Sequence, residues 1–284
     1  TIDRLDHPNS TLEEVMQFIK GPDFPTGAIL EGIDGIKSAY LTGRGKIILK
    51  SKVTMEKNKI VIHEIPYEVN KALLVRKMDE IRIDKKMDGI LEVRDESDKD
   101  GLRIVVDLKK DANAENILNY FYKNTELQIS YNFNNVVIVN RRPMLLGILG
   151  ILDAYIAHQK EVVTRRSEFD LRTANARYHI VEGLIKAISI LDEVIKTIRS
   201  SKNKADAIGN LVKEYDFTEK QADAIVTLQL YRLTNTDIVS LQEEMKKLLD
   251  TMKKLEAILG DEKVLIKVLK KELKEIKDKY ATPR

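Results

Sequence analysis

The amino-acid sequence predicts an α+β protein, in which a small mixed α/β domain precedes a long antiparallel coiled coil with a helical knob at its far end. Between residues 46 and 139, short apolar runs of period 2 are separated by helical stretches, which indicates a sheet-containing domain. Between 238 and 280, apolar residues recur at spacings of four and three, the pattern of a coiled-coil seam. A weaker pattern of the same kind over 148–199 supplies the second helix that such a seam needs.

The seam over 238–280 sets the length of the coiled coil. It continues for almost six heptads, and eleven of its twelve positions are apolar, Glu262 being the exception. At about 1.5 Å per residue it forms an arm of roughly 60 Å. Gly260 can end one helix and Asp261 can cap the next, but the sequence leaves open whether the helix breaks there. The register resumes in phase after Asp261, so two stacked helices would serve the same seam as one continuous helix. The twelve positions are Leu241, Met245, Leu248, Met252, Leu255, Leu259, Glu262, Ile266, Leu269, Leu273, Ile276 and Tyr280.

Composition limits the classes of function. The chain has 284 residues, enough for two domains, and 33% of them are charged, which suits long solvated helices. Because the net charge is only +3, a nucleic-acid site must be sought locally. Cysteine is absent, which excludes disulfides and thiolate metal sites, and no apolar run is long enough to span a membrane. The chain opens on Thr1 rather than Met and its seam closes at Tyr280, so we expect both ends to be cuts in a longer protein.

The N-terminal segment predicts two short helices. Ser10 or Thr11 caps a helix that runs through Ile19, with glutamates at capping-box distance. A second helix near 33–41 ends at Gly43.

The α/β domain begins where the apolar period changes from about 3.6 to 2. From residue 59 onward the predicted order is strand, helix, strand, strand, helix, strand, which indicates a ferredoxin-like split arrangement. Pro143 is expected to close the domain. The predicted elements are a hairpin of 46–54 and 59–65, helix 69–83, strands 89–95 and 102–108, helix 113–122 and strands within 127–139.

The outgoing arm of the coiled coil changes character along its length. Its first half has one apolar residue per heptad, and its second half has two. Between the arms, a helix to about 214 precedes a second one that begins with a capping box of Thr218 and Gln221. The predicted contact positions of the outgoing arm are Tyr155, Val162, Phe169 and Ala176, then Ile180, Leu184, Ala187, Leu191, Val194 and Ile198.

A candidate DNA-binding strand lies at the start of the α/β domain. Its cations fall on one face of an extended strand, roughly 6–7 Å apart, and can follow a phosphate backbone. The alternative is the solvated face of an edge strand protected by lysine. A second basic patch, Arg141-Arg142, lies where the chain leaves the domain. The cations of the strand are Arg44, Lys46, Lys50 and Lys52.

The helical knob is a candidate dimer interface. A knob at the tip of a long arm has little neighbouring protein on which to pack, so an apolar patch there favours contact with a second copy. The alternative is a local core that only turns the chain around. The candidate interface residues are Ala222, Ala224, Ile225, Leu228, Leu230 and Leu233.

Other candidate chemistry is weak. The acidic run from Glu96 to Asp107 superficially resembles a calcium loop, but strands flank it and Arg103 occupies an apolar position, so a solvated hairpin turn is favoured. The four histidines show no metal-ligand spacing, and no glycine-rich loop followed by Lys-Ser or Lys-Thr indicates an ATP site.

Seven motifs occur in order along the chain: Gly21-Pro-Asp-Phe-Pro-Thr26, Gly43-Arg-Gly-Lys46, Glu64-Ile-Pro-Tyr67, Val93-Arg-Asp-Glu96, Leu127-Gln128, His179-Ile-Val-Glu-Gly-Leu184 and Gln221-Ala-Asp-Ala-Ile-Val-Thr-Leu-Gln-Leu230. In this order they resemble the A subunit of bacterial type IIA DNA topoisomerases over essentially the whole chain. Three further runs, Asn70-Lys71, Tyr131-Asn-Phe-Asn134 and Leu230-Tyr-Arg-Leu-Thr234, are more similar to the A subunit of topoisomerase IV from Gram-positive bacteria than to that of gyrase.

The resemblance implies names for the parts of the chain. Residues 1–25 would link to a preceding domain, and 26–146 would form the tower domain that supports the arms of cleaved DNA. Residues 147–202 and 238–284 would be the outgoing and return arms of the coiled coil. Residues 203–237 would be the C-gate, where two A subunits meet and transported DNA leaves.

The resemblance also implies a function for the longer protein. It would pass one DNA duplex through a transient double-strand break in another, in decatenation or relaxation, using ATP and Mg²⁺ held by the B subunit of an A2B2 heterotetramer in the bacterial cytoplasm, at the nucleoid. The family's nucleophilic tyrosine belongs to a winged-helix domain that this sequence lacks; Arg177-Tyr178 imitates it within a coiled coil and is rejected. This part alone should be inactive and bind no cofactor.

Two other classes of function are compatible with parts of the pattern. A structural antiparallel coiled-coil tether or hinge protein would share the seam but not the ordered motifs of the α/β domain. An arm-bearing nucleic-acid enzyme such as a synthetase is disfavoured because no nucleotide loop is present.

Overall fold

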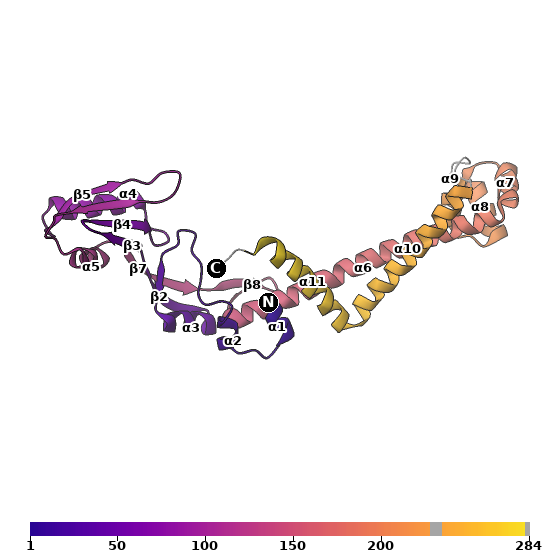
Figure 1. The fold of residues 1–284 in the computed structure, drawn as a ribbon. Helices are drawn as coiled ribbons and strands as arrows, with labels where there is room; N and C mark the ends of the chain where they lie inside the picture. The colour runs from indigo at the N-terminus through magenta and orange to yellow at the C-terminus, as the bar shows by residue number, and fades with distance from the viewer. Residues whose placement is uncertain (228–234, 282–284) are drawn as a thin grey trace. The chain divides into compact units, whose positions relative to one another are not determined.

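The computed structural model describes residues 1–227 and 235–281, with the side chains of 235–237 excepted. Apart from its first two residues, the chain divides into two compact units, Asp3–Tyr155 and Ile156–Arg284 (Figure 1). The boundary falls within one long helix, α6 (Ile148–Ser189). Among the described residues, no helix combines the length and the apolar character that a membrane crossing requires.

The first unit begins with two short helices, α1 (Ile2–Asp6) and α2 (Leu12–Met16). The predicted capping box is confirmed, because the Thr11 side chain accepts from the Glu14 amide while the Glu14 carboxylate accepts from the Thr11 amide at 2.7 Å. The helix is shorter than predicted. After Met16 the hydrogen bonds tighten, with the Phe18 amide donating to the Val15 carbonyl.

A three-stranded antiparallel sheet, sheet A, follows. Its order is β1-β2-β7. Helix α3 (Ile33–Thr42) packs on β2 and ends at Gly43, whose φ of 81° gives the left-handed cap that the sequence predicts. The strands of sheet A are β1 (Ile29–Glu31), β2 (Arg44–Lys50) and β7 (Gln128–Asn134).

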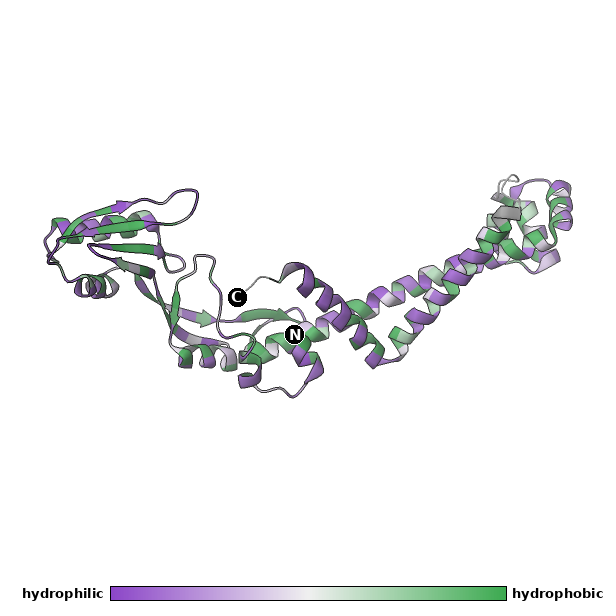
Figure 2. Cartoon of the chain, in the orientation of Figure 1, coloured by the Kyte–Doolittle hydropathy of each residue, from purple (hydrophilic) through white to green (hydrophobic). Residues whose placement is uncertain are grey.

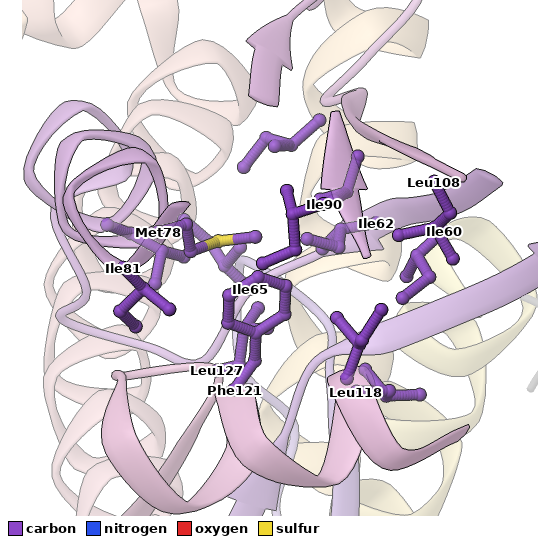
Figure 3. Packing of buried hydrophobic residues seen from close by; sticks show 14 residues of the cluster. Ile60, Ile62, Ile65, Met78, Ile81, Ile90, Leu108, Leu118, Phe121 and Leu127 are labelled. Carbon is purple, nitrogen blue, oxygen red and sulfur yellow. The ribbon is translucent and has the colours of Figure 1, made fainter. Parts of the chain in front are cut away.

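A second, four-stranded sheet, sheet B, holds the largest core of the unit. Its order is β3-β4-β6-β5, with every neighbouring pair antiparallel. Figure 3 shows Met78, Ile81, Leu118 and Phe121 of two helices directed toward the isoleucines of the sheet. The elements are β3 (Lys52–Glu56), β4 (Lys59–Glu64), β5 (Ile90–Asp95) and β6 (Ile104–Leu108), covered by α4 (Lys71–Ile83) and α5 (Ala114–Asn124).

The predicted chain order is confirmed from β4 onward, but the predicted ferredoxin-like sheet is wrong. Strand β3 takes the place beside β4 that the last strand of such a sheet would occupy, and β7 pairs with β2 instead. The first predicted strand, 46–54, is divided at Ser51, whose amide donates to the Leu127 carbonyl at 2.9 Å. The reason lies in β7, where Ile129, Tyr131 and Phe133 pack with the α3 core rather than with sheet B.

A hairpin of β8 (Val136–Val139) and β9 (Arg142–Leu145) ends the sheet-containing part. Pro143 therefore lies inside a strand and does not close the domain as predicted. A proline is tolerated there because the hairpin has only two strands, so each has one free edge.

The second unit is helical. The predicted arm over 148–199 is divided at Ile190, and a compact head, which includes three helices among the described residues, separates it from the return arm. The head has its own core around Leu211 and Phe217. Its elements are α7 (Leu191–Ser200), α8 (Lys204–Tyr215) and α9 (Glu219–Thr227), followed by α10 (Asn235–Gly260) and α11 (Glu262–Tyr280).

The head is tied to α6 by the capping box of α9. Thr218 and Gln221 cap the helix as predicted, and the Thr218 hydroxyl lies 2.7 Å from the Nε2 atom of His179 on α6. The Gln221 side chain also donates to the His179 carbonyl at 2.8 Å. A Cβ atom at Gly183 would lie 2.6 Å from Gln221, so only glycine permits this approach.

The return helix breaks at Gly260, one of the two possibilities that the sequence leaves open, but the single continuous seam is not formed. Asp261 caps α11 through its side chain, which accepts from the Lys263 amide. Figure 1 shows α11 turned at an angle to α10, and Figure 2 shows hydrophilic residues along most of α11. Ile276 and Tyr280, the last predicted seam positions, are 55% and 66% exposed.

Ion pairs locate the change of direction. Arg177 pairs with Glu244 and Lys160 with Glu262, which is an antiparallel course along α6. Glu272 then pairs with Arg166 rather than with a residue nearer the start of α6, so α11 does not continue that course. Because α11 begins at its own cap, Asp261, its axis differs from that of α10. The last seam positions of α11 therefore do not pack against α6.

The contact face of the outgoing arm differs from the prediction in its first half, whereas Leu184, Ala187 and Val194 of the second half are buried as predicted. Tyr155, Val162 and Phe169 are exposed, and so is Ala176. The covered face of α6 lies one or two residues away and consists of small or β-branched side chains, which permit close helix approach. Its buried residues in this stretch are Val163, Ser167, Ala174 and Val181.

The Arg177–Glu244 pair makes a testable contribution to the second unit. Both guanidinium contacts are short, at 2.6 and 2.9 Å, and the hydrogen bond from Arg177 lowers the pKa of Glu244. At neutral pH, Glu244→Gln should lower the free energy of unfolding by about 0.5–1 kcal/mol. Because the pKa of Glu244 is lower in the folded state, the difference should be complete above about pH 5 and disappear as the pH falls through the folded-state value. Urea unfolding across this range checks it, and Glu243→Gln, an exposed neighbour, should show no such difference.

Candidate nucleic-acid interface

Strand β2 presents a polar cationic face. Arg44, Lys46 and Lys50 alternate with Ile47 and Leu49, whose side chains are buried against α3. Since β2 is hydrogen-bonded to β1 on one side and to β7 on the other, it is the central strand of sheet A. This excludes the alternative of a lysine-protected edge strand for Ile48–Lys50, whereas Arg44–Ile47 pair with β7 alone.

Strand β7 extends this face with amide and hydroxyl side chains. In the register of the sheet, Arg44 lies opposite Asn134, Lys46 opposite Asn132 and Lys50 opposite Gln128. Sequence reasoning missed these residues. The available signal was the alternation over 128–134, where every second residue is polar and the others are apolar.

Lys50 and Lys52 are held by carboxylates. The Lys50 ammonium lies 2.8 Å from Glu31 and 5.3 Å from the centroid of the Tyr122 ring. Lys52 does not continue the cationic strand as predicted, because Ser51 separates β2 from β3 and places Lys52 in sheet B. Its ammonium lies 3.3 Å from Glu64.

Arg44 and Lys46 are the free cations of the strand. Both are exposed, and neither has an ion-pair partner within residues 1–227 and 235–281. They line a shallow depression together with Asn132 and Asn134 of β7. Guanidinium, ammonium and amide donors converging on an open surface suit the oxygens of a phosphate backbone.

Helix α3 supports this face from behind at very short range. A Cβ atom at Gly35 would lie 1.8 Å from the Lys46 carbonyl, and one at Gly45 would lie 2.2 Å from the Gly35 carbonyl. The Ser38 and Thr42 hydroxyls both donate to the Arg44 carbonyl, at 2.9 and 3.0 Å. The position of the two free cations is therefore fixed by backbone contacts.

Arg141 and Arg142 lie at the tip of the β8–β9 hairpin, apart from the other cations. Asn140 and Arg141 both have positive φ, which makes a tight left-handed turn. The base of the hairpin is bonded to the residue between α3 and β2, since the Asn135 amide donates to the Gly43 carbonyl at 2.9 Å. Four strand residues separate this base from the tip, about 13 Å. Sheet A and the hairpin thus form two separate basic patches on one unit, and both arginines are exposed.

Comparison with known proteins identifies the family. Residues 1–274 match the family described as the A subunit of DNA gyrase/topoisomerase IV. The chain belongs to this family. It is 60% identical over its full length to the A subunit of DNA topoisomerase 4 from Bacillus subtilis (strain 168), of which it covers 36%. It is 59% identical over 99% of its length to that of Streptococcus pneumoniae serotype 4, of which it covers 35%, and 57% identical over its full length to that of Staphylococcus epidermidis, of which it covers 36%.

The candidate dimer surface of this gyrase/topoisomerase IV family member is only partly described. Ala222 and Ile225 are buried in the core of the head, at 0% and 6% exposure, so they stabilise their own unit rather than offer surface to a second copy. Ala224 is partly buried against the same core. Leu228, Leu230 and Leu233 lie outside the described residues.

The remaining sequence candidates have no site of their own. The acidic run is a hairpin turn, as favoured: Asp98 and Gly101 bridge, and Glu96 accepts from Arg103 at 3.1 Å. Nowhere in the described part of this family member do three or more His, Asp or Glu side chains gather into a group that could hold a metal ion. Tyr178 lies within the long helix α6 and is partly buried, as expected for a coiled-coil residue.

Proposed function

We propose that this chain is part of the DNA breakage-reunion subunit of a type II topoisomerase that passes one duplex through another at the expense of ATP. The chain spans about one-third of the length of its curated relatives, which are named as A subunits of DNA topoisomerase 4. Family membership disfavours the alternative of an unrelated coiled-coil tether.

The contribution of the first unit is DNA support. The observation that carries it is the free pair Arg44 and Lys46 on the central strand of sheet A, backed by α3 and flanked by β7 amides. Phosphate contacts of this kind position a duplex without reading its sequence. Arg141 and Arg142 supply a second contact further along the same duplex.

Salt dependence tests this proposal directly. The logarithm of the binding constant for a linear duplex and the full chain should fall linearly with the logarithm of salt concentration. The slope should be about −3.6 if Arg44, Lys46, Arg141 and Arg142 each bind a phosphate, at roughly −0.9 per phosphate. Scrambling the duplex sequence should leave the affinity unchanged. A slope near zero, or binding that requires one sequence, contradicts a phosphate-supporting role.

The contribution of the second unit is dimerisation through the head. The segment from Leu228 to Leu233 is rich in leucine, and it directly follows α9, whose Ala222 and Ile225 are buried in the described core of the head. We therefore expect the leucines to contact a second copy of the chain. Light scattering should give a dimer, and Leu228→Asp with Leu230→Asp should give a monomer with an unchanged helix content. A wild-type chain that stays monomeric at high concentration contradicts dimerisation through the head.

The remaining parts of the parent enzyme complete the proposal. ATP and Mg²⁺ would be held by the B subunit in an A2B2 heterotetramer, in the bacterial cytoplasm at the nucleoid, and this chain would bind neither. The nucleophilic tyrosine would likewise come from outside this sequence. Linked DNA circles mixed with this chain alone should stay linked, and unlinking should require the longer A subunit together with the B subunit, ATP and Mg²⁺.

A further inference from the structure

Glu64 makes two contacts, one within sheet B and one that joins sheet B to the start of sheet A. One carboxylate oxygen accepts from the Ala28 amide at 2.7 Å, and the other lies 3.3 Å from the ammonium of Lys52. Glu64 ends β4 in sheet B, whereas Ala28 immediately precedes β1 in sheet A. The Glu64 side chain thus binds both the residue before β1, Ala28, and the cation Lys52.

The turn that Glu64 holds is unfavourable by itself. Gly27 and Ala28 both have left-handed φ values, 73° and 82°, and the second is not a glycine. Such a conformation costs free energy and persists only where neighbours enforce it. A Cβ atom at position 27 would lie 2.3 Å from the Glu64 carboxylate, so the glycine is what lets the carboxylate reach the turn.

The turn sets the register of a short edge strand. Strand β1 has only three residues and pairs with β2 alone, with Ile29 opposite Lys50 and Glu31 opposite Ile48. In this register Glu31 is the diagonal neighbour of Lys50 on the cationic face, and the two side chains form their 2.8 Å ion pair. A slip of one residue would move Glu31 to the opposite face.

We infer that Glu64 is a positioning residue that seats β1, and that Glu64 and Glu31 together limit the DNA-binding face to Arg44 and Lys46 by neutralising Lys52 and Lys50. This inference rests on the proposed DNA support by sheet A. In this inference the role of Glu31 and Glu64 is to keep Lys50 and Lys52 from binding phosphates, so that the DNA-binding face ends at Lys46.

A matched pair of variants separates seating from charge. Glu64→Gln and Glu64→Ala remove the same charge, but only glutamine can still accept from the Ala28 amide. Glu64→Gln frees Lys52 alone and should steepen the salt slope by about 0.9, as Glu31→Gln should by freeing Lys50. Glu64→Ala also releases β1 and should steepen it by about 1.8, matching the Glu31→Gln/Glu64→Gln double variant.

Hydrogen exchange provides the second measurement on the same full-length chains. Exchange at the Ala28 amide should rise at least tenfold, to order of magnitude, in Glu64→Ala and stay near the wild-type rate in Glu64→Gln. Glu193→Gln, the same charge change on the second unit, should leave both measurements unchanged.

Equal slopes and equal exchange rates for Glu64→Gln and Glu64→Ala would overturn the positioning role. If Glu31→Gln and Glu64→Gln both keep the wild-type salt slope, the two glutamates do not limit the DNA-binding face. Failure of the proposed DNA support has a different signature, because charge reversal of Arg44 and Lys46 would then leave duplex affinity unchanged.

Discussion

Replacing Arg44 and Lys46 together with glutamate is expected to weaken duplex binding by about 100-fold at low salt and to flatten the salt slope by about 1.8. Each free cation that loses a charge-assisted phosphate contact accounts for roughly a tenfold loss. Neither side chain has a carboxylate partner in the described part of the chain, so their full charge is available to DNA.

The matched control is Lys50→Gln with Lys52→Gln, compared with Arg44→Gln with Lys46→Gln, which makes the same change in charge. Both lysines are bound to carboxylates, so their loss removes two ion pairs rather than two free charges. The salt slope of the Lys50→Gln/Lys52→Gln variant should flatten by much less than that of the Arg44→Gln/Lys46→Gln variant. If the control costs as much affinity as the Arg44 and Lys46 variant, the cationic site is not confined to those two residues.

The second large effect is expected from Gly35→Ala. The added methyl carbon would lie 1.8 Å from the Lys46 carbonyl, a backbone atom that can move only if α3 separates from β2. We expect the first unit to lose about 3 kcal/mol of unfolding free energy, because overpacking against backbone has no low-energy relief. Urea unfolding, together with hydrogen exchange of the β2 amides, measures the loss.

Gly209→Ala is the control for Gly35→Ala. Gly209 lies in the interior of α8, and a Cβ atom there would meet nothing within 4 Å. The same substitution should therefore stabilise the second unit by about 0.5–1 kcal/mol through helix propensity alone. If Gly35→Ala and Gly209→Ala both raise, or both lower, the free energy of unfolding, packing of α3 on β2 does not decide the effect of Gly35→Ala.

Much of the fold follows from local chemistry that the sequence displays directly. Capping boxes at Thr11 and Thr218, the glycine cap at Gly43 and the break at Gly260 depend on residues within a few positions of one another. The predicted helices and strands of the α/β domain lie close to the observed ones for the same reason. Strand partners do not follow, since β7 could satisfy its alternating pattern against either sheet.

The candidate site shows the same division. Alternation predicts that Arg44, Lys46 and Lys50 share a face, and the structure confirms it. It cannot predict that Ser51 transfers Lys52 to another sheet, because that depends on a backbone hydrogen bond to Leu127. The seam in α11 fails similarly, since a heptad pattern persists in sequence even where a new helix axis carries it away from its partner.

The sequence by itself determined the α+β class, the helix caps at Thr11, Gly43 and Thr218, the cationic pattern of β2 and the resemblance to the topoisomerase A subunits. Only the tertiary structure decided which cations are free, because Glu31 and Glu64 reach Lys50 and Lys52 through the pairing of β1 with β2 and of β3 with β4. Charge is a property of a residue, whereas its availability to DNA depends on which neighbours the fold brings within hydrogen-bonding distance.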